Sequence, residues 1–301
     1  MKEIILGGDI SVCLFIGGFL IYQHKVRKNT KLVLQKYEKT LNKAVDDNKN
    51  EFFVKEKIAI LTKEEKEKFQ KITEKLKQCN DPIYEFYREL SRHTEPESRR
   101  NFIRNITSAS LEIADNKLQK NCDYESFYDQ TKNKLTIYKQ TPETLTHDLI
   151  HLSSNNRAVN TLGFYKTGKY KDEIYEIGIG LNEGYTEVLN QRFFEPLNVN
   201  SPKLVRLSSL IEKFYQNPKN MEKDYFDACL ENLILELTKS MDIKDAINII
   251  LKIDYISFHP NDRIFYNKLI KQLIELYRQS HKRQETKEFM EEAKKQLVKK
   301  K

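Results

Sequence analysis

Two histidines four residues apart, in the stretch HDLIH at 147–151, are well placed to bind a metal ion. On a helix, residues i and i+4 lie on one face a turn apart, so the imidazoles of His147 and His151 would point the same way. Such a pair can bind one tetrahedral zinc ion, and a catalytic zinc site needs a third protein ligand and an open position for water. Glu183 and Glu187, in LNEGYTEVL at 181–189, have the same spacing. The four side chains together predict a zinc site.

These two segments together resemble the gluzincin branch of zinc metallopeptidases, the thermolysin-like zincins. That family has HExxH on one helix and NExxx[DE] at the start of a downstream helix, and this chain has HDLIH and NEGYTE. The resemblance covers about residues 134–195 and includes KLTIYK, which in the family would be the strand at the sheet edge beside the active-site helix. It implies His147, His151 and Glu183 as zinc ligands, and Glu187 as the acceptor that fixes the His147 ring. The connector between the helices is longer than in compact family members, which leaves Glu183 and Glu187 as alternatives for the third ligand.

Asp148 follows the first histidine, at the position where the family pattern has Glu. In the family, that carboxylate takes a proton from zinc-bound water and passes it to the leaving amine. Asp is one methylene shorter, so its oxygens fall short by about 1.5 Å, one C–C bond length. A misplacement of about 1 Å can cost roughly a hundredfold in rate. A carboxylate remains, and a small helix shift or an intervening water could restore contact, so we expect Asp148 to act as the general base of a slow or specialised peptidase.

No motif marks the residue that would stabilise the tetrahedral oxyanion. In the family, a His or Tyr from beyond the second helix has this role. His259, in SFHPND, is the plausible downstream histidine. Tyr165, Tyr170 and Tyr185 are alternatives that lie before or within the second helix, and a structural role is open for each of these residues.

The two helices that would carry the site have recognisable ends. For the first, Thr141 can serve as the cap and Pro142 suits the first helical position, with SSNN at the end. The second is expected from about Asn182 to Phe194, and it stops at Pro196. The Gly- and Tyr-rich segment between the two helices predicts a loop or a hairpin.

The rest of the chain predicts an α+β fold that is mainly helical. Gly and Pro are scarce, at 9 and 7 of 301 residues, and Lys/Glu/Leu/Ile stretches are long. Short β-branched and aromatic runs between 105 and 140, separated by turn residues, predict three or four strands of a small antiparallel or mixed, zincin-like sheet. TKEE at 62–65 is a capping box, Asp81-Pro82 starts another helix, and everything after 203 is helical in pattern.

Residues 4–22 form a long apolar run that Asp9 interrupts. As a helix the run would span about 28 Å, enough for a bilayer core. A signal peptide would need a clear basic start and cleavage site, and a buried helix would not be followed at once by HKVRKNTK. We therefore expect a single-pass cell-membrane anchor, with the soluble part in the cytoplasm because basic residues follow the run. The predicted segments are a transmembrane anchor at 1–24, a charged helical stem at 25–80, a zincin-like α+β half at 81–200 and a helical C-terminal half at 201–301.

Charge and cysteine usage narrow the classes of function. The net charge of +8 comes mostly from Lys interleaved with Glu, which is typical of solvated helix faces, so no nucleic-acid partner is expected. The four cysteines are far apart and make no disulfide framework, which fits a reducing compartment. We predict a membrane-anchored zinc metallopeptidase that hydrolyses a peptide or protein substrate with zinc-activated water.

Two alternatives compete with a working peptidase. The first is a catalytically weak or inactive zincin-fold protein, because of Asp148, that acts as a zinc-containing scaffold or peptide-binding module. The second is a basic helical interaction protein for nucleic acid or acidic lipid, in which the histidine pair is accidental, and it predicts no bound zinc. The sequence does not indicate an oligomeric state.

Overall fold

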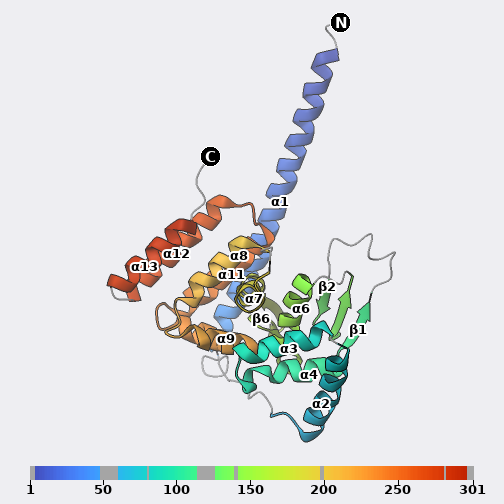
Figure 1. Cartoon of the computed structure of the whole chain (residues 1–301). Coiled ribbons are helices and arrows are strands. Elements are labelled where there is room, and N and C mark those ends of the chain that lie inside the picture. The colour runs from blue at the N-terminus through green and yellow to red at the C-terminus, as the bar shows by residue number, and fades with distance from the viewer. Residues whose placement is uncertain are drawn as a thin grey trace.

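A computed structural model describes most of the chain, and for the first helix it describes side chains from Val26 onward. The described residues are 4–47, 60–79, 81–113, 126–138, 142–196, 200–280 and 283–296. The helices described are α1 (Ile4–Asp47), α2 (Lys63–Gln78), α3 (Pro82–His93), the 3₁₀ helix η1 (Pro96–Arg99), α4 (Arg100–Ser108), α6 (Pro142–Ser154), the 3₁₀ helix η2 (Arg157–Val159), α7 (Ile179–Phe194), α8 (Pro202–Glu212), α9 (Pro218–Phe226), α10 (Leu230–Leu237), α11 (Ile243–Phe258), α12 (Arg263–Ser280) and α13 (Arg283–Gln296). The strands described are β1 (Ser110–Ile113), β2 (Ser126–Asp129), β3 (Lys134–Ile137), β4 (Asn155–Asn156), β5 (Thr161–Leu162), β6 (Tyr165–Tyr170) and β7 (Glu173–Ile177). The mainly helical α+β prediction is confirmed (Figure 1).

Local sequence signals set several helix starts as predicted. Thr62 and Glu65 form the capping box of α2, each bonding the backbone N–H of the other. Asp81 caps α3 by accepting from the N–H of Ile83, with Pro82 at the first helical position. Thr141, the predicted cap of α6, lies outside the described residues, although α6 does begin at Pro142.

The first sheet has three strands in the order β1-β3-β2. β1 pairs with β3 in parallel and β2 pairs with β3 antiparallel, so the sheet is mixed. The prediction of strands between 105 and 140 is confirmed, but the expected position of KLTIYK is wrong. β3, formed by its first four residues, is the central strand, and the edge strand β2 is the one that contacts α6. Because β1 and β2 pair with the two sides of β3, that strand has no unpaired edge, whereas β2 has one within the described residues.

The segment between the two site helices forms a second sheet with the strand order β4-β5-β6-β7. β6 and β7 make the predicted hairpin, with Lys166 opposite Ile177 and Tyr170 opposite Glu173. The short strands β4 and β5, which follow α6 directly, were not expected from the sequence. The sheet places the end of β7 immediately before α7, so it fixes where the second site helix begins.

The C-terminal helices surround α7. α8 and α11 both pack on α7, and α10 and α12 pack on α11. The core here is aliphatic and aromatic, with fully buried residues that include Tyr185, Leu189, Leu207, Ile250 and Tyr266. α7 is therefore a central helix of the molecule, enclosed by α6 on one side and by the C-terminal helices on others (Figure 1).

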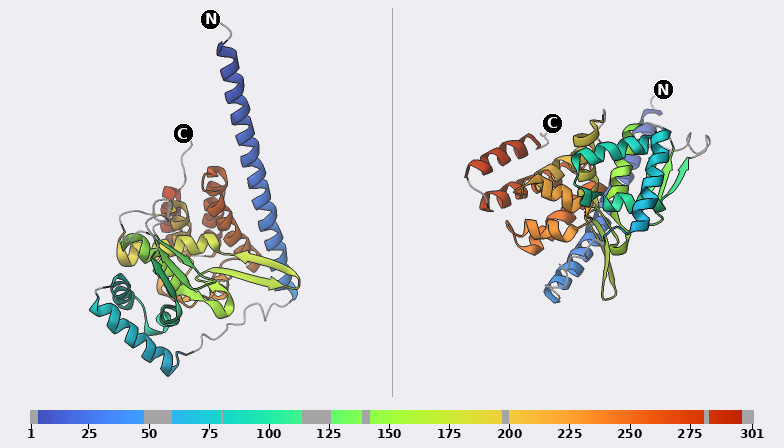
Figure 2. Two further views of the ribbon diagram at one scale, coloured as in Figure 1. Left: turned by 90° about the vertical axis from the view of Figure 1, so that its right-hand side faces the viewer. Right: turned by 60° about the horizontal axis from the view of Figure 1, so that its bottom comes forward.

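The segment predicted as a charged stem forms α2 and the described part of α1, and both pack onto the rest of the molecule. α1 contacts α11, β6 and β7, and α2 contacts α3 and α4. Leu41 and Val45 of α1 are 0% and 2% exposed and belong to the main core. Figure 2 shows the lower part of α1 beside the β6–β7 hairpin and the upper part projecting away from the body.

No helix within the described residues is long and apolar enough to cross a membrane. The side chains of the predicted anchor, residues 1–24, lie outside the described part, where only the helical backbone from Ile4 is given. The transmembrane prediction therefore finds no support in the structure, and the anchor and the cytoplasmic orientation stay predictions from the sequence.

Candidate metal centre

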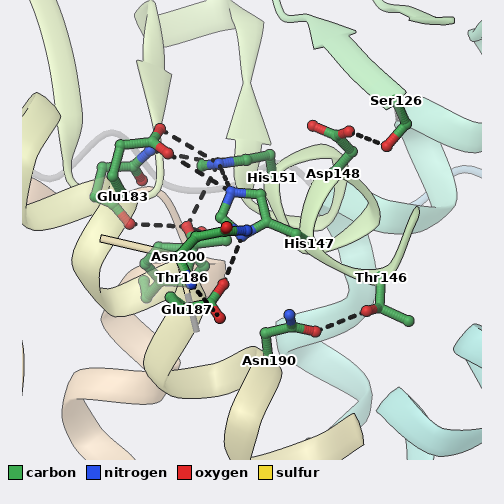
Figure 3. Close-up of polar contacts among 12 residues, drawn as sticks. Ser126, Thr146, His147, Asp148, His151, Glu183, Thr186, Glu187, Asn190 and Asn200 are labelled. Carbon is green, nitrogen blue, oxygen red and sulfur yellow. Dashed lines mark hydrogen bonds and ion pairs between the residues drawn. The ribbon is translucent and has the colours of Figure 1, made fainter. Parts of the chain in front are cut away.

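α6 and α7 bring together the histidines and glutamates singled out in the sequence (Figure 3). α6 presents His147 and His151 toward the N-terminal half of α7, where Glu183 and Glu187 lie. Thr146 of α6 donates to the Asn190 side chain of α7 at 2.7 Å, which ties the two helices further along. The four predicted side chains therefore meet at one helix–helix contact.

The other face of α6 is fixed from α4. Asn105, which is buried, donates to the carbonyl oxygens of Leu152 and Asn155 at 2.8 and 2.7 Å. These carbonyls belong to the last turn of α6 and to the residue after it, where a helix leaves backbone acceptors without partners. Asn105 therefore holds the C-terminal end of the helix that carries the histidines.

The potential ligand atoms of His147, His151 and Glu183 lie close together, with one atom from each residue within 4.8 Å of the others. The two Nε2 atoms are 3.1 Å apart, Nε2 of His151 is 3.3 Å from Oε1 of Glu183, and Nε2 of His147 is 3.6 Å from Oε2 of Glu183. Ligands bound tetrahedrally to zinc at about 2.0–2.1 Å lie about 3.3–3.4 Å from one another. Because each oxygen of Glu183 approaches a different histidine, an ion bound through one of these oxygens would require the carboxylate to turn.

Glu187 holds the far side of the His147 ring. Its Oε2 is 3.0 Å from Nδ1 of His147, and its Oε1 accepts from the backbone N–H of Asn200 at 3.2 Å. The Glu187 side chain is 1% exposed, whereas that of Glu183 is 41% exposed. Glu183 therefore lies on the side of the histidine Nε2 atoms, and Glu187 lies on the outer nitrogen of His147. A carboxylate on the outer nitrogen orients a ligating imidazole and raises its basicity.

The pKa values of His147 and Glu183 indicate that these two groups favour a positive charge between them. Burial alone would lower the pKa of His147, but hydrogen bonds with Glu183 and Glu187 outweigh it and raise this pKa to about 10. Burial would raise the pKa of Glu183, but the charge of His151 and hydrogen bonds from both histidines hold it well below its ordinary value. A proton or a metal ion can supply that positive charge, and the two compete for the same imidazole nitrogens.

His151 is held on its other nitrogen by residues that the sequence analysis did not single out. Nδ1 of His151 lies 3.4 Å from Oγ1 of Thr186, which donates its own proton to the carbonyl of Asn182 at 2.8 Å and lies 2.5 Å from the Tyr225 hydroxyl. The side-chain amide nitrogen of Asn182 lies at the same 3.4 Å from Nδ1, so Thr186 and Asn182 hold this side of the ring and Nε2 faces the cluster. Thr186 lies within NEGYTE, between the two glutamates, whereas nothing in the sequence points to Tyr225.

Asp148, the predicted general base, is engaged by another residue. Its Oδ2 accepts a hydrogen bond from the hydroxyl of Ser126, at the start of β2 (Figure 3). In this view the carboxylate points toward β2 and away from the space between the histidines and Glu183. Burial raises the pKa of Asp148. The sequence places Asp148 next to a ligand, but only the fold reveals the Ser126 contact.

The contacts described for the four oxyanion candidates do not include the histidines or glutamates of the cluster. Tyr185 is buried and donates to Glu212 at 2.8 Å, and Tyr170 bonds Asp47. The Tyr165 hydroxyl accepts from Thr167. His259 ends α11 and packs on Tyr255, with ring centroids 4.7 Å apart.

The start of α7 is held by a buried carboxylate from α11. Gly178 has a φ of +89°, in the left-handed region that glycine favours. Asp254, 1% exposed, accepts from the N–H groups of Gly178 and Gly180 at 2.8 Å each. Burial raises the pKa of Asp254 to about 7. This cap explains why α7 begins at Ile179 and not at about Asn182, as the sequence suggested.

The chain matches no family model, no curated protein and no solved structure. The candidate metal centre is therefore defined by its own geometry, and no family membership follows from these comparisons.

Proposed function

We propose that His147, His151 and Glu183 bind one zinc ion and that the site hydrolyses peptide bonds. The observation that carries the proposal is the mutual spacing of the three ligand groups, 3.1 to 3.6 Å, on two helices that are locked to each other. Two imidazoles and one carboxylate are a donor set of catalytic zinc sites, which keep a fourth position for water or substrate. Zinc in such a site supplies a Lewis acid and an activated water.

The exposure of the groups fits an open site. Glu183 is 41% exposed at its side chain, whereas His147 and His151 are 16% and 8% exposed. The imidazoles are thus supported by protein on most sides, and solvent reaches the cluster from the side of the carboxylate. A structural zinc site would instead be closed by four protein ligands.

Asp148 is the residue of this chain that we propose to move protons in the reaction. To do so its carboxylate has to turn from Ser126 toward the ligand cluster, because Ser126 holds one of its oxygens. Before that turn, the hydrogen bond from the Ser126 hydroxyl holds the Asp148 carboxylate in place. General acid–base help of this kind contributes typically about 10²–10⁴-fold in rate.

The Ser126–Asp148 bond also favours a second candidate, a zinc-containing protein without turnover. In that case Asp148 is a structural link between α6 and the edge strand β2, and the zinc site serves as a scaffold or peptide-binding module. The two candidates share the metal and differ in whether Asp148 contributes to a reaction.

Metal content of the purified full chain, measured by inorganic mass spectrometry, tests the zinc site that both candidates share. We expect one zinc per chain in the wild type and none in His151→Ala. The matched control is His93→Ala on α3, whose ring bonds Glu89 and stacks on Phe193. Wild type that holds no zinc after reconstitution would contradict both candidates and would favour an accidental histidine pair.

Turnover of a peptide library then separates the two candidates. If the site is catalytic, Asp148→Ala should keep its zinc and lose roughly 10²–10⁴-fold in kcat/KM. Asp148→Glu should stay active, because the longer side chain reaches further. Stoichiometric zinc with no turnover in the wild type and in Asp148→Glu would establish the scaffold.

A further inference from the structure

Basic side chains from three separate segments gather where α1 leaves the body. Arg27 and Lys31 lie on α1, Lys203 and Arg206 on α8, and Arg263 at the start of α12. Figure 1 shows the connection between α11 and α12 beside α1 at this place. The Arg27 guanidinium is 4.0 Å from Oδ2 of Asp262 in that connection, and the ammonium of Lys203 donates to the carbonyl of Pro260 there.

The positive charge of this region is poorly balanced. Asp262 is the carboxylate that contacts it, and that group also accepts from the Tyr255 hydroxyl at 3.0 Å. Five cations against this one carboxylate leave four positive charges among the described residues. Burial, with Arg263 and Arg206 nearby, lowers the pKa of Lys203, as expected for crowded like charges. Elsewhere on the surface several cations each pair with an acid, as Arg88 does with Glu85, Lys134 with Glu112 and Lys244 with Asp46.

Large apolar side chains are exposed at both ends of the same connection. Phe258, at the end of α11, is 53% exposed, and Ile264, in the first turn of α12, is 71% exposed. An exposed aliphatic side chain among cations is typical of surfaces that enter the interface of an anionic bilayer. Nucleic-acid sites also gather cations, but those that bind single strands favour aromatic rings for stacking, whereas the more exposed of these two side chains is the aliphatic Ile264.

We propose that this surface docks on anionic phospholipid headgroups. We call it the basic collar, and it comprises Arg27, Lys31, Lys203, Arg206 and Arg263 together with Phe258 and Ile264. The cations would contact lipid phosphates and carboxylates while Phe258 and Ile264 enter the upper acyl region. α1 continues from the collar as one helix toward the apolar run 4–22 of the sequence, so membrane contact by that run would bring the collar to the headgroups. The docking does not require the run to cross the bilayer, and it is independent of the proposed zinc chemistry.

Vesicle co-sedimentation of the full chain tests the docking. We expect tighter binding to phosphatidylcholine vesicles that contain phosphatidylserine than to phosphatidylcholine alone, and the difference should shrink as salt is added. Arg206→Gln/Arg263→Gln should weaken binding to the acidic vesicles roughly thirtyfold, at about 1 kcal/mol for each basic residue near the surface. It should leave binding to the neutral vesicles unchanged. Ile264→Ser should weaken binding to both kinds of vesicle.

The matched control is Arg88→Gln/Arg92→Gln, which removes the same charge from α3, away from the collar (Figure 1). It should bind acidic vesicles as the wild type does. If Arg206→Gln/Arg263→Gln, the collar variant, melts at a lower temperature than the wild type, a second variant is needed. Arg206→Lys/Arg263→Lys keeps both positive charges and must retain binding to acidic vesicles. Equal binding to neutral and acidic vesicles, or an equal loss in the α3 control, would overturn the proposal. Binding to duplex DNA that the collar variant loses, with vesicle binding unchanged, would identify a nucleic-acid surface instead.

Discussion

At the residue scale, the candidate site depends on how two glutamates one turn apart divide their roles. Glu183 approaches the Nε2 atoms of both histidines, and Glu187 approaches the opposite nitrogen of His147. Because Glu187 is buried and also binds the backbone N–H of Asn200, it cannot swing toward the ligand position without losing that bond. The arrangement gives each carboxylate a role that the other cannot take over.

Glu187→Gln should lower zinc affinity roughly 10–100-fold, the usual cost of losing the carboxylate that orients a ligating histidine. The amide keeps the shape of the side chain but loses its charge, so the ring of His147 is less well fixed and less basic. Competition with a chromophoric chelator measures the change. Glu195→Gln, at the exposed end of the same helix, should match the wild type. An unchanged affinity in Glu187→Gln would contradict the role given to this residue.

At the element scale, the position of α7 decides whether the two ligand helices meet. α7 packs closely on α8 because residue 184 is a glycine, and a Cβ there would overlap the carbonyl oxygen of Leu204 and the hydroxyl of Ser208. Asp254 of α11 fixes the first turn of the same helix. The glutamates of α7 therefore owe their place to contacts on the side of the helix that faces away from α6.

Gly184→Ala should lower the free energy of unfolding by about 1–3 kcal/mol, the usual cost of adding a methyl group to a filled contact. The same change should weaken zinc binding, because α7 has to shift and carries Glu183 and Glu187 with it. Urea unfolding and chelator competition measure the two effects. A stable variant with unchanged zinc affinity would show that α8 can give way without moving α7.

The buried carboxyl of Asp254 should make stability depend on pH. In the folded chain burial raises its pKa to about 7, from an ordinary value of 3.8 in the unfolded chain. Between these values the folded state binds the extra proton, so the free energy of unfolding should fall as pH rises and level off above about 7.

Asp254→Asn lacks this titrating group, so its free energy of unfolding should fall less steeply with pH over the same pH range. Urea unfolding with a metal chelator present, at about pH 5 and about pH 8, measures the slope, because these two conditions lie on either side of the raised pKa. The chelator removes the contribution of metal binding. Equal slopes in the wild type and in Asp254→Asn would contradict the raised pKa.

At the scale of the whole molecule, the N-terminal helix is part of the fold. The last turns of α1 pack on α11 and on the β6–β7 hairpin, which leads directly into α7. Tyr170 of the hairpin bonds Asp47, and Lys171 pairs with the same carboxylate at 2.9 Å. The helix thus supports the second sheet from outside, and the second sheet leads into the candidate metal centre.

Leu41→Ala should lower the free energy of unfolding by about 2–5 kcal/mol, as deletion of a buried leucine side chain does. Leu41 is 0% exposed, whereas Leu32, nearer the start of the same helix, is 55% exposed. Leu32→Ala is therefore the matched control and should change stability by less than about 0.5 kcal/mol. Urea unfolding compares the two variants. A similar small effect in both would mean that α1 is not part of the cooperative fold.

The sequence by itself determined the features that depend on neighbouring residues. The capping box at Thr62, the Asp81-Pro82 start and the spacing of His147 and His151 all follow from covalent geometry within one or two turns. The mainly helical character and the strands between 105 and 140 follow from composition and local patterning. These features needed no knowledge of distant residues, so the structure agrees with them.

Only the tertiary structure decided how those elements meet. It separated the roles of Glu183 and Glu187, turned Asp148 toward Ser126, made β2 the edge strand and packed α1 into the core. Each of these outcomes joins residues that are far apart in sequence or chooses between two orientations of one helix. Local propensity does not distinguish between such arrangements, because their energies differ only through long-range packing and hydrogen bonds.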